Sequence, residues 1–184
     1  MNRYTLLLML LAVCCSSAVV AQNAPLSTDQ VAEMKRLAEQ GIVGAQFYLG
    51  YMYAKGEGVA ENDAEAVRWY RLAADQGNVD AQYELGVMYD DGEGVAENDA
   101  EAVKLFRIAA DQGNARAQLY LGIKYGKGEG VPESKVDAYF WWNLAAAQGD
   151  EAARFHKGLI KEKMTREQIA EAQRRSAAWK PKKN

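Results

Sequence analysis

A repeat of 36 residues restricts what this chain can fold into more than any other feature of its sequence. Two sets of small residues mark the period: Gly41, Gly77, Gly113 and Gly149, and Ala45, Ala81, Ala117 and Ala153. Residues 45–80 and 81–116 are identical at 25 of 36 positions, and residues 81–116 and 117–152 at 15 of 36. A period of this length is typical of architectures in which one supersecondary unit recurs along the chain. We therefore expect three repeats, with these boundaries.

Each repeat is predicted to contain a helix, a glycine-containing loop and a second helix. The first helix of the first repeat covers about residues 45–54, with apolar residues at three- and four-residue intervals on its inward face. Gly56 is expected to end it, because glycine readily adopts the left-handed backbone of a helix C-terminus. Asn62 or Asp63 can cap the start of the second helix. The predicted buried stripe of that helix consists of Ala66, Val67, Trp69, Tyr70, Ala73 and Ala74.

A glycine inside the first helix recurs in every repeat, as Gly50, Gly86 and Gly122. A glycine within a helix costs about 1 kcal/mol relative to alanine, so three of them require a reason. We expect a neighbouring helix to pass too close to each of these positions for a Cβ atom.

One helical hairpin of this kind cannot bury its apolar face alone, but stacked hairpins share a continuous core. The sequence therefore predicts an all-α, superhelical α-solenoid of antiparallel helix hairpins. Residues 22–44 are interpreted as an N-terminal capping half-repeat, and residues 153–180 as a C-terminal partial repeat and capping helix, followed by a tail at 181–184. Thr165 and Gln168 form a capping-box pattern at the start of the last helix.

The first 21 residues have the order of a secretory signal peptide, with a positive start at Arg3, an apolar run and small residues that end at Ala21. We expect cleavage after Ala21 and a periplasmic or secreted protein with no membrane span. Two alternatives remain open: an uncleaved anchor and lipidation at Cys14. Because both cysteines, Cys14 and Cys15, lie in this segment, the processed chain would contain no disulfide.

Charge is unevenly distributed along the chain. Residues 22–153 contain 11 Lys and Arg against 22 Asp and Glu, whereas residues 154–184 contain 10 against 3. An acidic body argues against nucleic acid as a partner, since phosphate backbones require basic surfaces. The basic C-terminal end is a candidate contact for an anionic surface, although most charge runs serve only to solvate a helix face.

The sequence contains no recognisable catalytic set. His156 is its single histidine, and neither a triad spacing nor a Ser-x-x-Lys motif accompanies it. The processed chain would also lack any cysteine nucleophile or cysteine-ligated metal. We therefore predict that the protein is not an enzyme and uses no metal or cofactor.

The repeated pattern resembles the Sel-1-like repeat family, a relative of the tetratricopeptide repeats. The pattern is Ala-Gln-x-x-Leu-Gly-x-x-Tyr, then Gly-x-Gly-Val, then Ala-Ala-x-Gln-Gly, and it covers about residues 45–152. The resemblance implies a right-handed superhelix that acts as an adaptor or scaffold by binding a protein or peptide. Some secreted members with a cysteine pair in each repeat are linked to β-lactams, but this chain has no such pairs. The third repeat also departs from the first two, with Pro132 replacing alanine and Lys135 replacing the capping Asp63 and Asp99.

The face of the first helices opposite their buried side is the candidate binding surface. At 100° per residue this face is apolar and aromatic with a charge at its end, whereas a solvated face would be polar. We call it the outer stripe, and its residues are Tyr48, Tyr51, Lys55, Glu84, Val87, Asp91, Tyr120, Ile123 and Lys127.

Several occupants of the outer stripe are compatible with the sequence. Aromatic anchors on an apolar surface favour another protein or peptide. The same tyrosines could stack on a cell-wall glycan or a small ligand. By family analogy, a hydrolase of cell-wall material or β-lactams is a further alternative. Packing against the next repeat is an alternative for the whole surface, above all for the adjacent row of Phe47, Tyr83 and Leu119.

Overall fold

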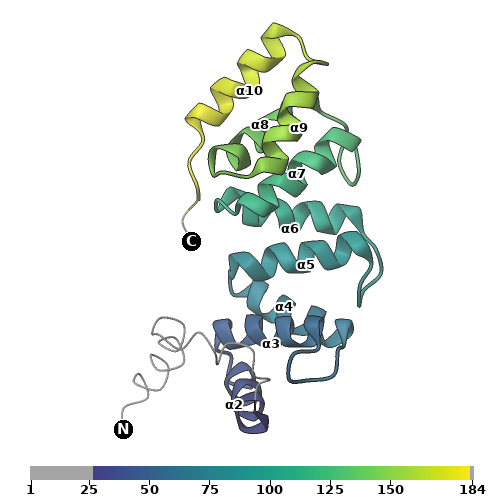
Figure 1. The fold of residues 1–184 in the computed structure, drawn as a ribbon, viewed down its shortest axis with the longest axis vertical. Coiled ribbons are helices and arrows are strands. Elements are labelled where there is room, and N and C mark those ends of the chain that lie inside the picture. Colours follow the sequence, from purple (N-terminus) through teal and green to yellow (C-terminus); the bar gives the residue numbers. More distant parts are fainter. Residues whose placement is uncertain (1–26, 183–184) are drawn as a thin grey trace.

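The computed structural model describes residues 27–182, which form nine helices and no strand. Along the chain these are α2 (Thr28–Glu39), α3 (Val43–Lys55), α4 (Asp63–Asp75), α5 (Val79–Asp91), α6 (Asp99–Asp111), α7 (Ala115–Lys127), α8 (Lys135–Ala147), α9 (Glu151–Lys161) and α10 (Arg166–Ala178). The helices stack along one long axis, with α2 at one end and α10 at the other (Figure 1). The predicted all-α solenoid is confirmed.

The three predicted repeats are the hairpins α3–α4, α5–α6 and α7–α8. The helices of a hairpin pack against each other, and the second helix of each also packs against the first helix of the next. Buried side chains form clusters that run across these junctions, such as Tyr70 and Ala74 of α4 with Leu85 and Met88 of α5. The core is therefore continuous along the stack, as expected for hairpins that cannot bury their apolar faces alone.

A glutamine at the start of each first helix ties it to the preceding helix. Gln82 is buried, and its amide donates to the backbone carbonyl of Ala74, 3.2 Å away. Gln112, at the end of the second helix of the same hairpin, donates to the Gln82 side-chain oxygen over 2.8 Å. Equivalent bonds recur at Gln46 and Gln118, so each junction carries a satisfied buried amide.

The helix starts follow the capping pattern of the sequence. The Thr165 and Gln168 side chains form the expected capping box at α10. The second helices of the repeats are capped by Asn62, Asn98 and Ser134, whose side-chain oxygens each accept from a backbone amide three residues later. Of the two caps predicted for the first repeat, Asn62 is confirmed and Asp63 is wrong. Lys135, which replaces Asp63 and Asp99 in the third repeat, therefore does not remove a cap.

The glycines inside the first helices lie against aromatic rings of the second helices. A Cβ atom at Gly86 would lie 2.8 Å from the Phe106 ring, and one at Gly122 would lie 2.5 Å from Trp142. Gly50 has the same relation to Tyr70, at 2.7 Å. Real Cβ contacts are not this short, so the predicted close approach of a neighbouring helix is confirmed.

The C-terminal segment closes the stack on one side. Helix α10 packs against α8, and its Ala172 is fully buried. Trp179 follows the helix and packs on the same core. The chain then returns towards the turn between α6 and α7, where the Lys182 amide donates to the Asp111 carbonyl over 2.8 Å and the Lys182 amine pairs with its carboxylate over 2.6 Å.

Within the described range, no helix has the length and apolar character needed to span a membrane. The predicted signal segment, its cleavage position after Ala21 and the alternatives at Cys14 all lie outside the described residues.

Candidate functional site

The outer stripe begins on α3 with two tyrosines. Tyr48 is 36% exposed, and its ring stacks on that of Tyr51 with 6.1 Å between the centroids. The Tyr51 hydroxyl donates to the carboxylate of Glu57 over 3.3 Å, which fixes this ring to the following loop. Lys55 is exposed at the end of the helix. This part of the stripe presents one open aromatic ring and one cation to solvent.

Further along the stack, parts of the outer stripe join the packing between repeats. Tyr120 of α7 is half-buried, with its ring 5.3 Å from Phe106 and 5.7 Å from Tyr83. Val87 and Ile123 are also half-buried against core clusters. Most of the apolar character of the stripe on α5 and α7 therefore contributes to the fold as well as to the surface.

The charged ends of α5 and α7 remain at the surface. Asp91 is exposed, and Lys127 pairs with Glu129 over 3.3 Å. The residues of the row adjacent to the outer stripe differ in burial: Tyr83 is buried in the core, whereas Phe47 and Leu119 are half-buried. For Tyr83, packing against the next repeat is thus the observed role.

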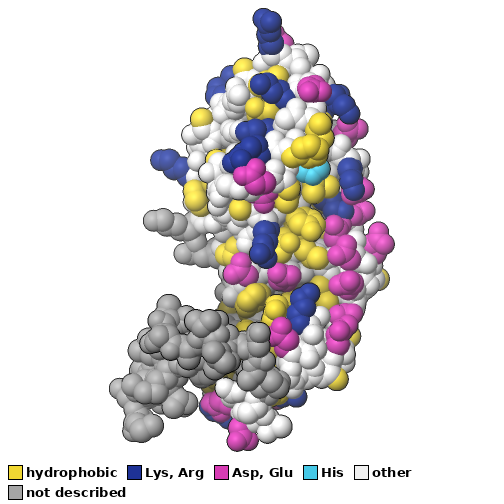
Figure 2. All heavy atoms as spheres, in the orientation of Figure 1, with side chains coloured by type: hydrophobic (Ala, Val, Ile, Leu, Met, Phe, Trp, Pro, Cys, Tyr) yellow, Lys and Arg dark blue, Asp and Glu magenta, His cyan; other side chains and the backbone are white. Residues whose placement is uncertain are grey.

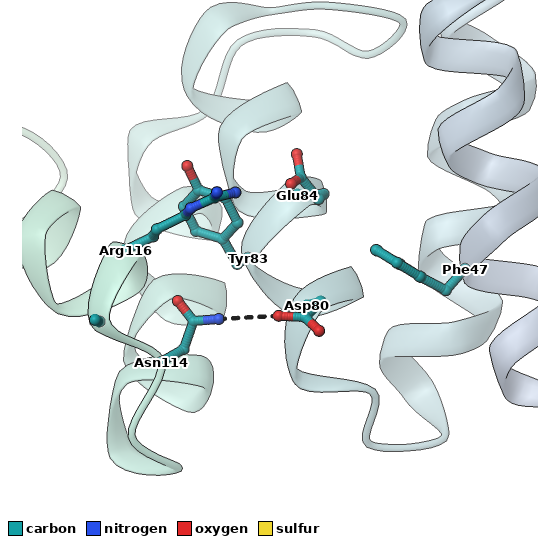
Figure 3. Close-up of a pocket in the computed structure, with 7 residues that line it drawn as sticks. Phe47, Asp80, Tyr83, Glu84, Asn114 and Arg116 are labelled. Atoms are coloured by element: carbon teal, nitrogen blue, oxygen red, sulfur yellow. Dashed lines mark hydrogen bonds between the residues drawn. The ribbon is translucent and has the colours of Figure 1, made fainter. Parts of the chain in front are cut away.

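A pocket of about 360 Å³ opens where the first helices of the three repeats meet (Figure 3). Its lining residues come from α3, α5 and the start of α7, and they are Phe47, Asp80, Tyr83, Glu84, Asn114, Ala115 and Arg116. Phe47 faces the two carboxylates from one side, and Asn114 and Arg116 approach from the other. The pocket therefore combines aromatic walls with two acids and one base.

Glu84 is the residue of the outer stripe that lies in this pocket. Its carboxylate is half-buried, and among residues 27–182 it has no ion pair within 4.0 Å. Burial raises the pKa of Glu84, while the charges of Arg116 and Lys55 act in the opposite direction. Asp80 accepts a hydrogen bond from the Asn114 amide over 3.2 Å. A partly buried carboxylate with a perturbed pKa in a cleft marks a candidate functional site.

The other polar residues of the pocket were not predicted from the sequence. Asp80 and Arg116 lie one helical turn before Glu84 and Tyr120, so they share the same face of their helices. Extending the stripe by four residues towards each helix start would have found them.

Both the outer stripe and the adjacent row continue beyond the third repeat. Phe155 and Leu159 of α9 occupy the positions of Leu119 and Ile123 one period later, and they are 63% and 48% exposed. The 36-residue register predicts both positions. His156, between them, is half-buried, and its ring stacks on that of Trp142 with 5.2 Å between the centroids.

A second charged cluster lies inside the stack and is structural. Lys124 is buried in α7, where Met52 and Met88 stand in the earlier repeats. Its amine pairs with Asp90, with Asp99 over 2.7 Å and with Glu129 over 3.1 Å. Burial acts to lower the pKa of Lys124, but the hydrogen bonds to these carboxylates outweigh it and raise the pKa above the usual lysine range. The pKa of Asp90 is raised by burial and only partly restored by Lys124.

Between residues 27 and 182, no group of three or more histidine, cysteine, aspartate or glutamate side chains could hold a metal ion.

Stacked helical hairpins whose first helices together form one candidate binding surface define an α-solenoid repeat protein. Three consecutive matches to the Sel1 repeat cover residues 43–78, 79–114 and 115–150, so the chain belongs to the Sel1 repeat family. Sel1 repeat proteins generally serve as non-catalytic scaffolds for protein interaction. Each match begins two residues before the repeat start expected from the sequence.

Solved structures of two bacterial proteins are similar to this chain. A protective antigen of uropathogenic Escherichia coli that displays an SLR fold is 39% identical, with a TM-score of 0.74 over 82% of this chain and 33% of its own. A Sel1 repeat protein from Oxalobacter formigenes is 41% identical, with a TM-score of 0.64 over 70% of this chain and 96% of its own. This chain thus spans about a third of the length of the Escherichia coli antigen. No curated protein matches the sequence.

Proposed function

We propose that this protein is a non-catalytic adaptor that binds a segment of another protein along the first helices of its repeats. The observation that carries the proposal is the pocket between α3, α5 and α7, which is lined by Glu84 of the outer stripe, together with the exposed Tyr48 of the same stripe. Hydrophobic side chains gather along the middle of this face, and acidic side chains follow one edge (Figure 2). Apolar anchors with a charged rim are the usual anatomy of a protein interface.

Site-specific crosslinking tests this proposal in cells that express the chain. A photoreactive phenylalanine replaces Tyr48 on the outer stripe or, in a matched control, Leu72 on the second helix of the same repeat. Leu72 is 39% exposed, so the two positions offer similar access. We expect a discrete protein adduct from position 48 and none from position 72. Equal labelling from both positions, or none from position 48, would contradict the assignment of the binding face.

A glycan-binding role for the same tyrosines makes a different prediction. The Tyr48 and Tyr51 rings stack on each other, so the two inner faces of this pair are not open to a sugar. Sedimentation of the protein with purified cell-wall material, lost on Tyr48→Ala but retained on Leu72→Ala, would favour a glycan over a protein partner.

We further propose that the adaptor acts in the periplasm or outside the cell. The support is the order of residues 1–21, with a positive start, an apolar run and a small residue at Ala21. N-terminal sequencing of the protein purified from its own cells is the test. A chain that begins at Gln22 supports export, whereas an intact Met1 contradicts cleavage.

A further inference from the structure

We infer that the partner segment carries a lysine or arginine side chain, which enters the pocket between α3, α5 and α7 and pairs with Glu84 and Asp80. This inference rests on the proposed function, and it specifies the chemistry of the partner. This pocket combines carboxylates and aromatic walls with a place on the outer stripe, whereas the cavity beside α4 that Arg68, Arg71 and Leu72 line has no aromatic wall.

The size and walls of the pocket suit a single long side chain. Its volume of about 360 Å³ lies at the low end of the range for ligand sites. Phe47 and Tyr83 supply aromatic surface on which the aliphatic stem of a lysine or arginine can pack. The negative faces of these rings also attract a cation.

The charges of the pocket favour a cation over an anion. Two carboxylates, Asp80 and Glu84, face one guanidinium, Arg116, so the lining has a net negative charge. Glu84 is half-buried without a close counter-ion, whereas Arg116 is exposed and well solvated. An incoming ammonium or guanidinium group would restore the interactions that Glu84 has lost with water. An incoming carboxylate would instead have to approach both acids.

The surface around the pocket has a net negative charge, as the pocket itself does. Residues 22–153 contain 11 Lys and Arg against 22 Asp and Glu, so a basic segment is attracted before it docks. Acidic side chains along the edge of the face in Figure 2 extend this field beyond the pocket itself.

Three synthetic peptides test the inference against the purified full chain. They are acetylated and amidated, have two leucines on each side of a central residue, and differ only in whether that residue is Arg, Gln or Glu. Binding is followed by NMR through the side-chain carboxyl resonance of Glu84, which is assigned by its loss in Glu84→Gln. We expect the Arg peptide to shift this resonance saturably and to bind at least about fivefold more tightly than the Gln peptide, the range typical of a charge-assisted contact.

Variants distinguish the effect of the Glu84 carboxylate in the pocket from that of the overall negative charge of the surface. Glu84→Gln should abolish the preference for Arg, whereas Glu93→Gln, the same change in an exposed loop, should leave it intact. Arg116→Ala should strengthen binding of the Arg peptide, because it removes a competing cation. If the Glu peptide binds best and Arg116→Ala weakens it, the pocket receives an anion and the inference is wrong.

The outcome distinguishes this inference from the function on which it rests. Absence of any Glu84 shift up to about 10 mM peptide, a range that would detect even very weak contacts, overturns the cation site. If position 48 still crosslinks to a protein, the adaptor proposal stands and only the chemistry of the partner is wrong. If there is neither a shift of the Glu84 resonance nor a protein crosslink from position 48, both the cation site and the adaptor function are contradicted.

Discussion

At the scale of single residues, one row of glycines shows how the sequence encodes helix packing. In three repeats a glycine of the first helix admits a ring of the second, as Gly86 admits Phe106. The fourth member of the row is Gly158 in α9, and nothing lies within 4 Å of its Cβ position. The same residue therefore has a packing role in the repeats and none at the end of the stack.

Alanine substitution in this row should have opposite effects at the two positions. Gly86→Ala forces the Phe106 ring aside and should lower the free energy of unfolding by about 1–2 kcal/mol, because overpacking costs more than helix propensity returns. Gly158→Ala should raise it by up to about 1 kcal/mol, since only propensity changes. Urea denaturation of both variants measures the difference. Stabilisation by both substitutions would show that the ring moves freely.

The half-buried carboxylate of Glu84 predicts a pH-dependent effect on stability. Its pKa is raised in the folded state, with Asp80, Lys55, Arg116 and the nearby tyrosines as its charged or titratable neighbours. Folding therefore disfavours its ionised form, and this cost is present above the raised pKa and absent below the unfolded one.

Replacement of Glu84 by glutamine should consequently raise stability at neutral pH, by at most about 1 kcal/mol for a partly solvated group. The gain should fade as the pH drops through the raised pKa towards about 4.3, the ordinary glutamate value. Thermal unfolding of both proteins across this range is the measurement. If the stability gain of Glu84→Gln does not change with pH, the gain does not come from the ionisation of Glu84. A site that sacrifices stability in this way is common where a ligand must be bound.

At the scale of helices, the junction between the second and third repeats differs from the one before it. Ala54 and Met88 meet in an apolar cluster between the first two repeats. One period later the corresponding residues are Asp90 and Lys124, which form a buried ion pair. Replacing one partner of such a pair leaves a desolvated charge, whereas replacing both with packed apolar residues is often neutral.

The single substitution Lys124→Met should therefore lower the free energy of unfolding by about 3 kcal/mol. The double variant Asp90→Ala/Lys124→Met copies the Ala54 and Met88 junction and should recover most of that loss. Urea denaturation of the wild type, both single variants and the double variant gives the coupling energy. Additive losses in the double variant would show that the pair is not an energetic unit.

At the scale of the whole molecule, the stack behaves as a one-dimensional array in which each hairpin contacts only its neighbours. Its C-terminal end is held by Trp179 against the core and by Lys182 on Asp111. Changes at that end should remain local, because the main packing contacts among residues 27–182 join elements that are close along the stack.

Removal of residues 179–184 tests this locality. We expect faster amide hydrogen exchange in α10 and in the turn between α6 and α7, with unchanged protection in α2, α3 and α4. Mass spectrometry of the peptic fragments after exchange reports each region separately. Loss of protection throughout the chain would mean that the solenoid unfolds as a single cooperative unit.

Sequence alone determined the period, the helical hairpins and the close approach at Gly50, because these depend on residue spacing and on local backbone preference. It also placed Glu84 on the outward face. Only the tertiary structure decided which outward residues are open, since burial depends on the neighbouring repeat: Tyr83 is buried and its ring packs against Tyr120 of α7, whereas Phe155, in the same row, is exposed. The pocket likewise required three helices to be brought together before Asp80, Glu84 and Arg116 could act on one another.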